Sequence, residues 1–124
     1  TGLSGSSDWF ERGFVTYSNA AKTEQLGVPA ALIEAHGAVS EPVARAMALG
    51  AVAHSRAQVS VAVTGVAGPT GGSADKPVGL VWFGWAVGEQ AWTECQRFDG
   101  DRDAVRAATV RHGLQGLLQR LATA

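Results

Sequence analysis

Cysteine is almost missing from this sequence, which holds Cys95 alone among 124 residues. A single cysteine excludes the internal disulfide framework that small secreted domains use, so we expect a reducing, cytoplasmic compartment. Cys95 falls inside an expected strand with no partner motif around it. We interpret it as a small apolar strand residue rather than as a catalytic thiol.

An excess of charge of one sign is also missing. The 10 lysines and arginines nearly balance the 11 aspartates and glutamates, and the formal net charge is −1. That balance argues against a surface built to neutralise a nucleic-acid backbone. No apolar run is long enough to span a membrane. We therefore expect neither a nucleic acid nor a membrane as a partner.

Metal-binding patterns are the third absence. His36, His54 and His112 are scattered, and none belongs to an H-E-x-x-H motif or to a His/Cys pair at ligand spacing. Each histidine is expected near a helix end, where a cation suits the helix dipole. We expect no metal ion and no other cofactor.

Apolar residues make up 46% of the chain and charged residues 17%, a composition typical of a folded domain. A chain of this length accommodates one domain with a substantial core. The numbering opens at Thr1 rather than at a methionine, so we expect a piece of a longer chain.

Hydrophobic periodicity predicts the order of the elements. Strands are expected at 14–17, 58–64, 78–87 and 91–98, and helices at 20–26, 29–36, 40–54 and 101–121. This β-α-α-α-β-β-β-α order predicts an α/β domain of three layers, α/β/α, with a mixed sheet. The strand at 78–87 is apolar on both faces, which is typical of a central strand covered by helices.

Apolar side chains in the last helix and the strands are assigned to the interior. The last helix has a stripe of apolar residues at helical spacing, which we interpret as core: Val110, Leu114, Leu117, Leu118 and Leu121. Met47 is interpreted as a core filler. The strand aromatics are interpreted as core or dimer contacts: Trp82, Phe83, Trp85 and Trp92.

The most distinctive stretch runs from Val59 to Val81, where two apolar runs flank a glycine-rich loop. Glycines let backbone N–H groups approach a ligand closely, so this loop could cradle an anion or an oxyanion. A long turn between two strands is the equal alternative. No Walker lysine-serine pair and no G-x-G-x-x-G motif opens a helix here.

Lys22 and Tyr17 flank the start of the expected helix 20–26. If Ser18 or Asn19 caps that helix, the macrodipole opposes the charge of Lys22 and lowers its pKa, especially with partial burial. A lysine with such a pKa suits the role of general base for a serine nucleophile. A solvated lysine on a short helix is the alternative.

Arg102 and Thr64 each allow two interpretations. Arg102 lies in G-D-R-D at an expected helix start, held there for an anion or paired on the surface with Asp99 or Asp103. Thr64 ends a buried strand, at the sheet edge where ligands of α/β folds gather. Its hydroxyl could instead bond its own turn.

Several segments resemble one protein family when taken together and in order. They are F-E-R-G-F-V-T-Y-S-N-A-A-K (10–22), H-G-A-V-S-E-P-V-A (36–44), V-T-G-V-A-G-P-T-G-G-S-A-D-K-P-V-G-L-V-W-F (63–83) and F-D-G-D-R-D-A-V-R (98–106). These segments resemble the C-terminal domain of the CinA family of competence/damage-inducible proteins, whose stand-alone members are nicotinamide-nucleotide amidases. The resemblance implies a single CinA C-terminal-like amidohydrolase domain over residues 1–124.

The resemblance also implies an activity and a set of site residues. The activity is hydrolysis of the carboxamide of nicotinamide mononucleotide to nicotinate mononucleotide and ammonia, in pyridine nucleotide salvage. It uses a serine nucleophile and a lysine base, without metal. Lys22 would be that lysine and Tyr17 its neighbour. The implied substrate-binding residues are Thr64, Gly65, Gly68, Gly71 and, at the phosphate end, Arg102.

One segment of the family pattern does not occur in this sequence. The family's nucleophile lies in E-S-C-T-G-G, on a strand and helix that precede the region resembling residues 1–8. Ser4, Ser6 and Ser7 correspond to the family's glycine-serine loop instead. We therefore expect an N-terminally truncated domain whose uncovered sheet lowers its stability or is buried in a homo-oligomer.

Two functions from different classes remain open. The first is the amidase described above. The second is a non-catalytic nucleotide-binding or interaction module of the CinA type, which the missing nucleophile segment favours and the retained Tyr17, Lys22, Thr64 and Arg102 disfavour. Reading the gene upstream of Thr1 would separate them.

Overall fold

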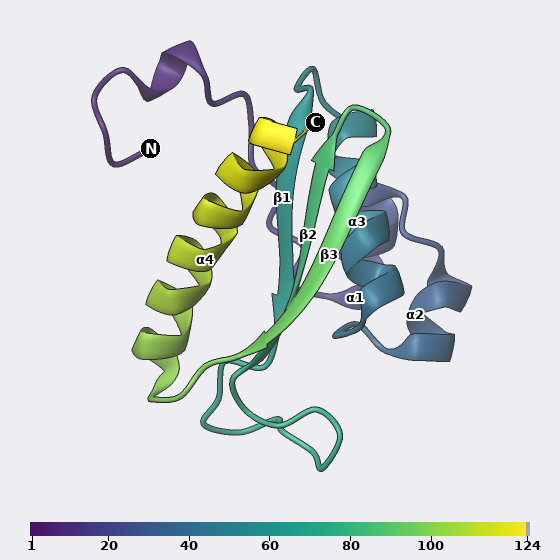
Figure 1. Cartoon of the computed structure of the whole chain (residues 1–124). Helices are drawn as coiled ribbons and strands as arrows, with labels where there is room; N and C mark the ends of the chain where they lie inside the picture. The colour runs from purple at the N-terminus through teal and green to yellow at the C-terminus, as the bar shows by residue number, and fades with distance from the viewer. Residues whose placement is uncertain (124) are drawn as a thin grey trace.

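A three-stranded antiparallel sheet forms the middle layer of the computed structural model, which describes residues 1–123 (Figure 1). Its strands are β1 (Val59–Gly65), β2 (Leu80–Val87) and β3 (Gln90–Arg97). Strand β2 lies in the centre, with Val63 opposite Phe83 on one side and Phe83 opposite Glu94 on the other. The expected central position of residues 78–87 is therefore confirmed.

Helices cover both faces of this sheet. The helical elements of residues 1–123 are a short 3₁₀ turn and four α-helices: η1 (Ser6–Asp8), α1 (Asn19–Leu26), α2 (Ala30–His36), α3 (Glu41–Ala53) and α4 (Arg102–Thr123). In Figure 1, α3 lies on one face with α1 and α2 beside it, and α4 lies on the opposite face. The α/β class with three layers is confirmed. Within residues 1–123 both strand pairs are antiparallel, so the parallel pairing of the expected mixed sheet is not among them.

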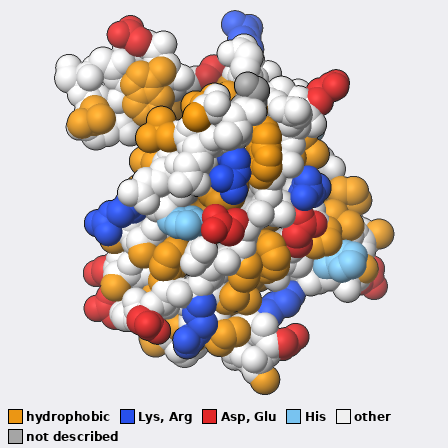
Figure 2. Space-filling model, viewed as in Figure 1, with side chains coloured by type: hydrophobic (Ala, Val, Ile, Leu, Met, Phe, Trp, Pro, Cys, Tyr) orange, Lys and Arg blue, Asp and Glu red, His pale blue; other side chains and the backbone are white. Residues whose placement is uncertain are grey.

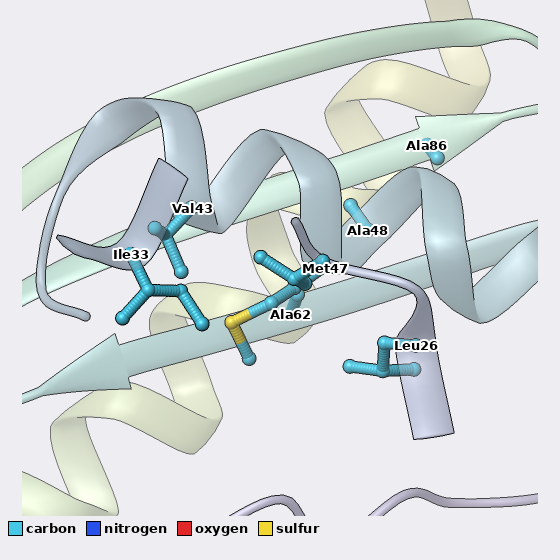
Figure 3. Packing of buried hydrophobic residues seen from close by; sticks show 8 residues of the cluster. Leu26, Ile33, Val43, Met47, Ala48, Ala62 and Ala86 are labelled. Atoms are coloured by element: carbon cyan, nitrogen blue, oxygen red, sulfur yellow. The ribbon is translucent and has the colours of Figure 1, made fainter. Parts of the chain in front are cut away.

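Small residues let α3 approach the sheet closely. A Cβ on Gly84 of β2 would collide with the carbonyl of Ala44 in α3, so only glycine allows this spacing. The core on this side contains Leu26, Val28, Ile33, Val43, Met47, Ala48, Ala62 and Ala86. Figure 3 shows Met47 reaching from α3 toward Ala62 of β1, which confirms Met47 as a core residue.

Larger side chains fill the space between the sheet and α4. Phe83 and Trp85 are fully buried and stack with their ring centroids 5.6 Å apart. The indole N–H of Trp85 donates to the carbonyl of Gly113 in α4 at 2.8 Å, which satisfies the one polar atom of that ring. These two aromatics are core residues as expected, whereas Trp82 and Trp92 are half-buried.

The expected apolar stripe on α4 does not face the core. Val110, Leu114, Leu118 and Leu121 are 63%, 52%, 68% and 44% exposed, and only Leu117 packs against buried residues. Helix α4 instead meets the sheet through Val105, through Gly113 beside Val61 and Phe83, and through Gly116, which allows a close approach to Trp85. The helical spacing of apolar residues identifies the apolar stripe. The small residues, however, decide which side of α4 approaches the sheet.

His112 also departs from its expected place near a helix end, because it lies in the middle of α4. Its Nε2 lies 2.9 Å from a carboxylate oxygen of Glu94 on β3, and its ring packs 4.7 Å from that of Phe83. His36 and His54 do lie at helix C-termini. His112 therefore serves as a polar contact between α4 and the sheet.

The expected strand at 14–17 does not form. These residues are not paired with any strand, and Val15 and Tyr17 are 86% and 92% exposed. A strand exists only through hydrogen bonds to a neighbour, so a strong β propensity without a partner leaves the segment irregular. Figure 2 shows further hydrophobic side chains on the N-terminal segment at upper left, where Leu3 and Trp9 are 76% and 65% exposed.

Candidate functional site

A groove of about 920 Å³ runs along the free edge of β1. Residues 7–17 form one wall and residues 55–65 form the other. Lys22 also lines it, as do side chains of the helices on the two faces of the sheet, including Met47 of α3 and Leu114 of α4. Because β1 has no neighbour on this side among residues 1–123, its outward N–H and C=O groups face the groove.

Lys22 is the most unusual side chain in this groove, because it is an ammonium group with only 6% of its residue surface exposed. Its Nζ donates to the main-chain carbonyls of Thr16 at 2.8 Å and Tyr17 at 3.4 Å. Carbonyls bring no full negative charge, so burial lowers the pKa of Lys22. The sequence predicts a lowered pKa from the helix dipole together with partial burial. The burial part of this expectation is confirmed, because desolvation lowers the pKa of Lys22 in the structure.

The start of α1 fixes where Lys22 lies. Ser18 caps this helix as expected, its hydroxyl oxygen accepting from the N–H of Ala21 at 3.0 Å. Lys22 follows one turn later and reaches back to the residues just before the cap. Tyr17 lines the groove as well, but its ring is exposed, and its contact with Lys22 is through the main chain.

Thr64 lies at the end of β1 and is 7% exposed. Its hydroxyl donates to the carbonyl of Ala38 at 2.8 Å, which ties β1 to the segment between α2 and α3. The hydroxyl therefore does not bond its own turn, which was the alternative for this residue. Because the hydroxyl donates its proton to Ala38, its oxygen lone pairs remain free to accept a hydrogen bond. Thr64 and Gly65 both line the groove together with Lys22 and Tyr17.

The glycine-rich loop, residues 66–79, connects β1 to β2 beyond the end of the groove. Gly68 and Gly71 adopt positive φ values of 81° and 92°, which suit glycine. The guanidinium of Arg102, the first residue of α4, donates to the carbonyl of Gly68 at 3.0 Å. Gly68 and Arg102 therefore lie side by side, and neither they nor Gly71 are among the residues that line the groove.

Arg102 does not form the surface ion pair considered as its alternative. Asp99 lies 3.7 Å from Arg97, and Asp103 lies 3.9 Å from Arg106. Arg102 is instead held by the loop carbonyl, with most of its N–H donors still available.

Lys76 is a residue that sequence reasoning missed. Its Nζ donates to the carbonyl of His36 at 2.8 Å, across 40 positions of sequence. Lys76 belongs to the D-K-P part of the family pattern, and no local signal in the sequence predicts a contact over that separation.

Neither a candidate metal cluster nor a candidate membrane-spanning helix occurs in the described part of the chain. Residues 1–123 contain no cluster of three or more His, Cys, Asp or Glu side chains suited to a metal ion. Among the helices of those residues, none combines the length and hydropathy that a bilayer crossing needs.

Comparisons with known proteins agree on one family. A sequence profile of the CinA C-terminal domain matches residues 1–121. The nicotinamide-nucleotide amidohydrolase PncC of Pseudomonas putida is 58% identical over 119 residues, which cover 96% of this chain and 74% of that protein. The PncC of Escherichia coli K12 is 51% identical over 121 residues, 97% of this chain and 73% of that protein. A CinA-like protein of Syntrophobacter fumaroxidans is 47% identical, and the match covers 29% of its length.

Solved structures share the fold. The competence/damage inducible protein CihA of Agrobacterium tumefaciens superposes with a TM-score of 0.91 at 46% identity, over 94% of this chain and 72% of that chain. A CinA superfamily protein of E. coli superposes with a TM-score of 0.90 at 41% identity, over 95% and 69%. The chain belongs to the CinA C-terminal domain family.

Proposed function

We propose that this domain is the amidohydrolase domain of an enzyme that converts nicotinamide mononucleotide to nicotinate mononucleotide and ammonia, in pyridine nucleotide salvage. The observation that carries this proposal is Lys22, a buried lysine with a lowered pKa that lines a groove. Relatives that are 58% and 51% identical are named nicotinamide-nucleotide amidohydrolase.

The proposed reaction uses Lys22 in its neutral form. The amine takes the proton of a serine hydroxyl as the serine oxygen attacks the carboxamide carbon. Lys22 then gives that proton to the departing nitrogen, the C–N bond breaks and ammonia leaves. Water hydrolyses the resulting acyl-enzyme ester and regenerates the serine. Burial favours this cycle because it stabilises the neutral amine relative to the ammonium.

The serine of this mechanism is proposed to come from a segment of the E-S-C-T-G-G type, upstream of Thr1. Of the serines that line the groove, Ser60 is already committed, since its hydroxyl donates to the carbonyl of Ala48 at 2.7 Å. The groove lies between residues 7–17 and the free edge of β1. A strand inserted there would pair with β1 on one side and give residues 14–17 the neighbour that they lack.

The remaining groups have proposed roles around the substrate. Thr64 and Gly65 line the same groove as Lys22 and would contact the nicotinamide part of the substrate. Backbone N–H groups of the following loop, near Gly68 and Gly71, would stabilise the oxyanion or bind the ribose phosphate. Arg102 would contact the phosphate.

The direct test is ammonia release from nicotinamide mononucleotide by the protein encoded by the whole gene. We expect Lys22→Ala to lower kcat/KM by roughly 10²- to 10⁴-fold, the usual contribution of a positioned general base. Arg45→Met serves as a control, because Arg45 lies on the outer side of α3 and contacts Glu41 and Ala91. A folded Lys22→Ala protein with full activity would rule out this mechanism.

A non-catalytic nucleotide-binding or interaction module is the second candidate. One observation favours it: within residues 1–123, Lys22 bonds only main-chain carbonyls and no serine hydroxyl. This candidate predicts that the protein binds nicotinamide mononucleotide without releasing ammonia. The gene sequence upstream of Thr1 would also separate the two, because the amidase requires a serine-bearing segment there.

A further inference from the structure

The short segment 36–38 is held from two sides. The hydroxyl of Thr64 donates to the carbonyl of Ala38, and the ammonium of Lys76 donates to the carbonyl of His36, both at 2.8 Å. Gly37 lies between them with a φ of 79°, and a Cβ there would touch Nζ of Lys76. The ammonium therefore lies directly over Gly37, one residue from the partner of Thr64.

The charge of Lys76 is not neutralised by a carboxylate. None of the ion pairs formed within residues 1–123 includes Lys76, and the neighbouring Asp75 accepts a hydrogen bond from Ser73 instead. The carbonyl of His36 uses one of the three ammonium N–H groups, so two remain. A second cation, Arg102, contacts the same loop at Gly68 and keeps free donors in the same way.

We propose that Lys76 is a specificity-determining residue that binds the phosphate of the substrate. The inference rests on the proposed function and adds a residue to it. In a mononucleotide the phosphate lies at the opposite end from the carboxamide. Lys22 lines the groove where the carboxamide would react, and Lys76 lies just beyond the end of the groove that Thr64 marks. A lysine without a carboxylate partner suits a phosphate dianion, which it binds through charge-assisted hydrogen bonds.

The test compares a ligand with phosphate and the same ligand without it. Nicotinate mononucleotide and nicotinate riboside are titrated into the whole-gene protein by calorimetry, because neither contains an amide that the enzyme could consume. We expect Lys76→Met to weaken binding of the mononucleotide by about ten- to a hundredfold, the loss typical of one charge-assisted hydrogen bond. Binding of the riboside should change less than about twofold, and Lys76→Arg should retain part of the mononucleotide affinity.

Arg45→Met is the matched control, since it also removes a cation that donates to a main-chain carbonyl, that of Ala91 at 3.1 Å. It should change neither affinity. An equal loss for both ligands in Lys76→Met would assign Lys76 a purely structural role and overturn the proposal, as would no loss for either ligand.

Hydrolysis is measured separately, so the amidase proposal and the phosphate-site proposal can fail independently. A protein that binds the mononucleotide through Lys76 but releases no ammonia would contradict the amidase and support the phosphate site. A protein that hydrolyses nicotinamide mononucleotide equally well with Lys76→Met would support the amidase and contradict the phosphate site.

Discussion

Lys22 illustrates, at the scale of one residue, how a local pattern and its tertiary surroundings combine. The helix start near Ser18 could be read from the sequence, and so could the presence of a lysine shortly after it. The burial of Lys22 could not, because it depends on how the folded chain packs around this side chain. Candidate residues are thus visible in a sequence, whereas the cause of a pKa shift requires the packed structure.

A prediction at this scale concerns the pH dependence of stability. Burial lowers the pKa of Lys22, so the folded protein loses this proton at a lower pH than the unfolded chain does. Between those two pH values the unfolded state binds more protons, and the free energy of unfolding rises with pH. Lys22→Met removes this contribution.

Urea unfolding at several pH values from 7 to 10 measures this contribution of Lys22 to the free energy of unfolding. The stability of wild type relative to Lys22→Met should increase as the pH approaches the ordinary pKa of lysine, about 10.4. A difference that stays constant over this range would show that folding leaves the pKa of Lys22 unchanged.

At the scale of elements, the strands were easier to predict than the faces of the helices. Strand β2 is apolar on both sides, and only a central strand covered on two faces accommodates that pattern. The segment 14–17 has equal β propensity but no partner in the described chain, so it stays unpaired. The stripe on α4 was assigned to the core because it is apolar, although Gly113 and Gly116 determine the contact with the sheet.

Two substitutions in α4 separate helix propensity from packing. Alanine favours a helix over glycine by roughly 1 kcal/mol. At Gly113 the added methyl group would lie 3.4 Å from Val61, an ordinary contact, so Gly113→Ala should leave stability unchanged or raise it by up to about 1 kcal/mol.

At Gly116 the methyl group would overlap the fully buried ring of Trp85. Gly116→Ala should therefore lower the free energy of unfolding by about 1–3 kcal/mol, the usual cost of overpacking. Chemical denaturation of both variants measures the difference. Similar stabilities would show that α4 adjusts its distance from the sheet without cost.

At the scale of the whole molecule, several large apolar side chains remain exposed. They include Leu3 and Trp9 in the N-terminal segment and Leu114 and Leu118 on α4, each more than half exposed. Exposed apolar surface of this kind favours association between protein molecules. The resemblance to a longer family domain suggested uncovered surface, but only the structure identifies which residues it contains.

We predict that a protein consisting of residues 1–124 alone associates with itself. Sedimentation velocity should show a weight-average mass that rises with concentration over the micromolar range. The double substitution Leu114→Glu and Leu118→Glu should shift the distribution toward monomer, because two carboxylates oppose burial of this surface. A single species with the mass of the monomer at every concentration of the unsubstituted chain would contradict the prediction.

The separation in sequence between the two groove walls affects how the protein is synthesised. Arg12 in one wall donates to the carbonyl of His54 beside the other, 42 residues later. At a few to about twenty residues per second, the ribosome takes several seconds to produce the second wall after the first. During that interval Trp9 and Phe10 lack the second wall, so the groove that they line is not yet formed. Chaperones that bind exposed aromatic residues therefore have a time window that is set by the speed of translation.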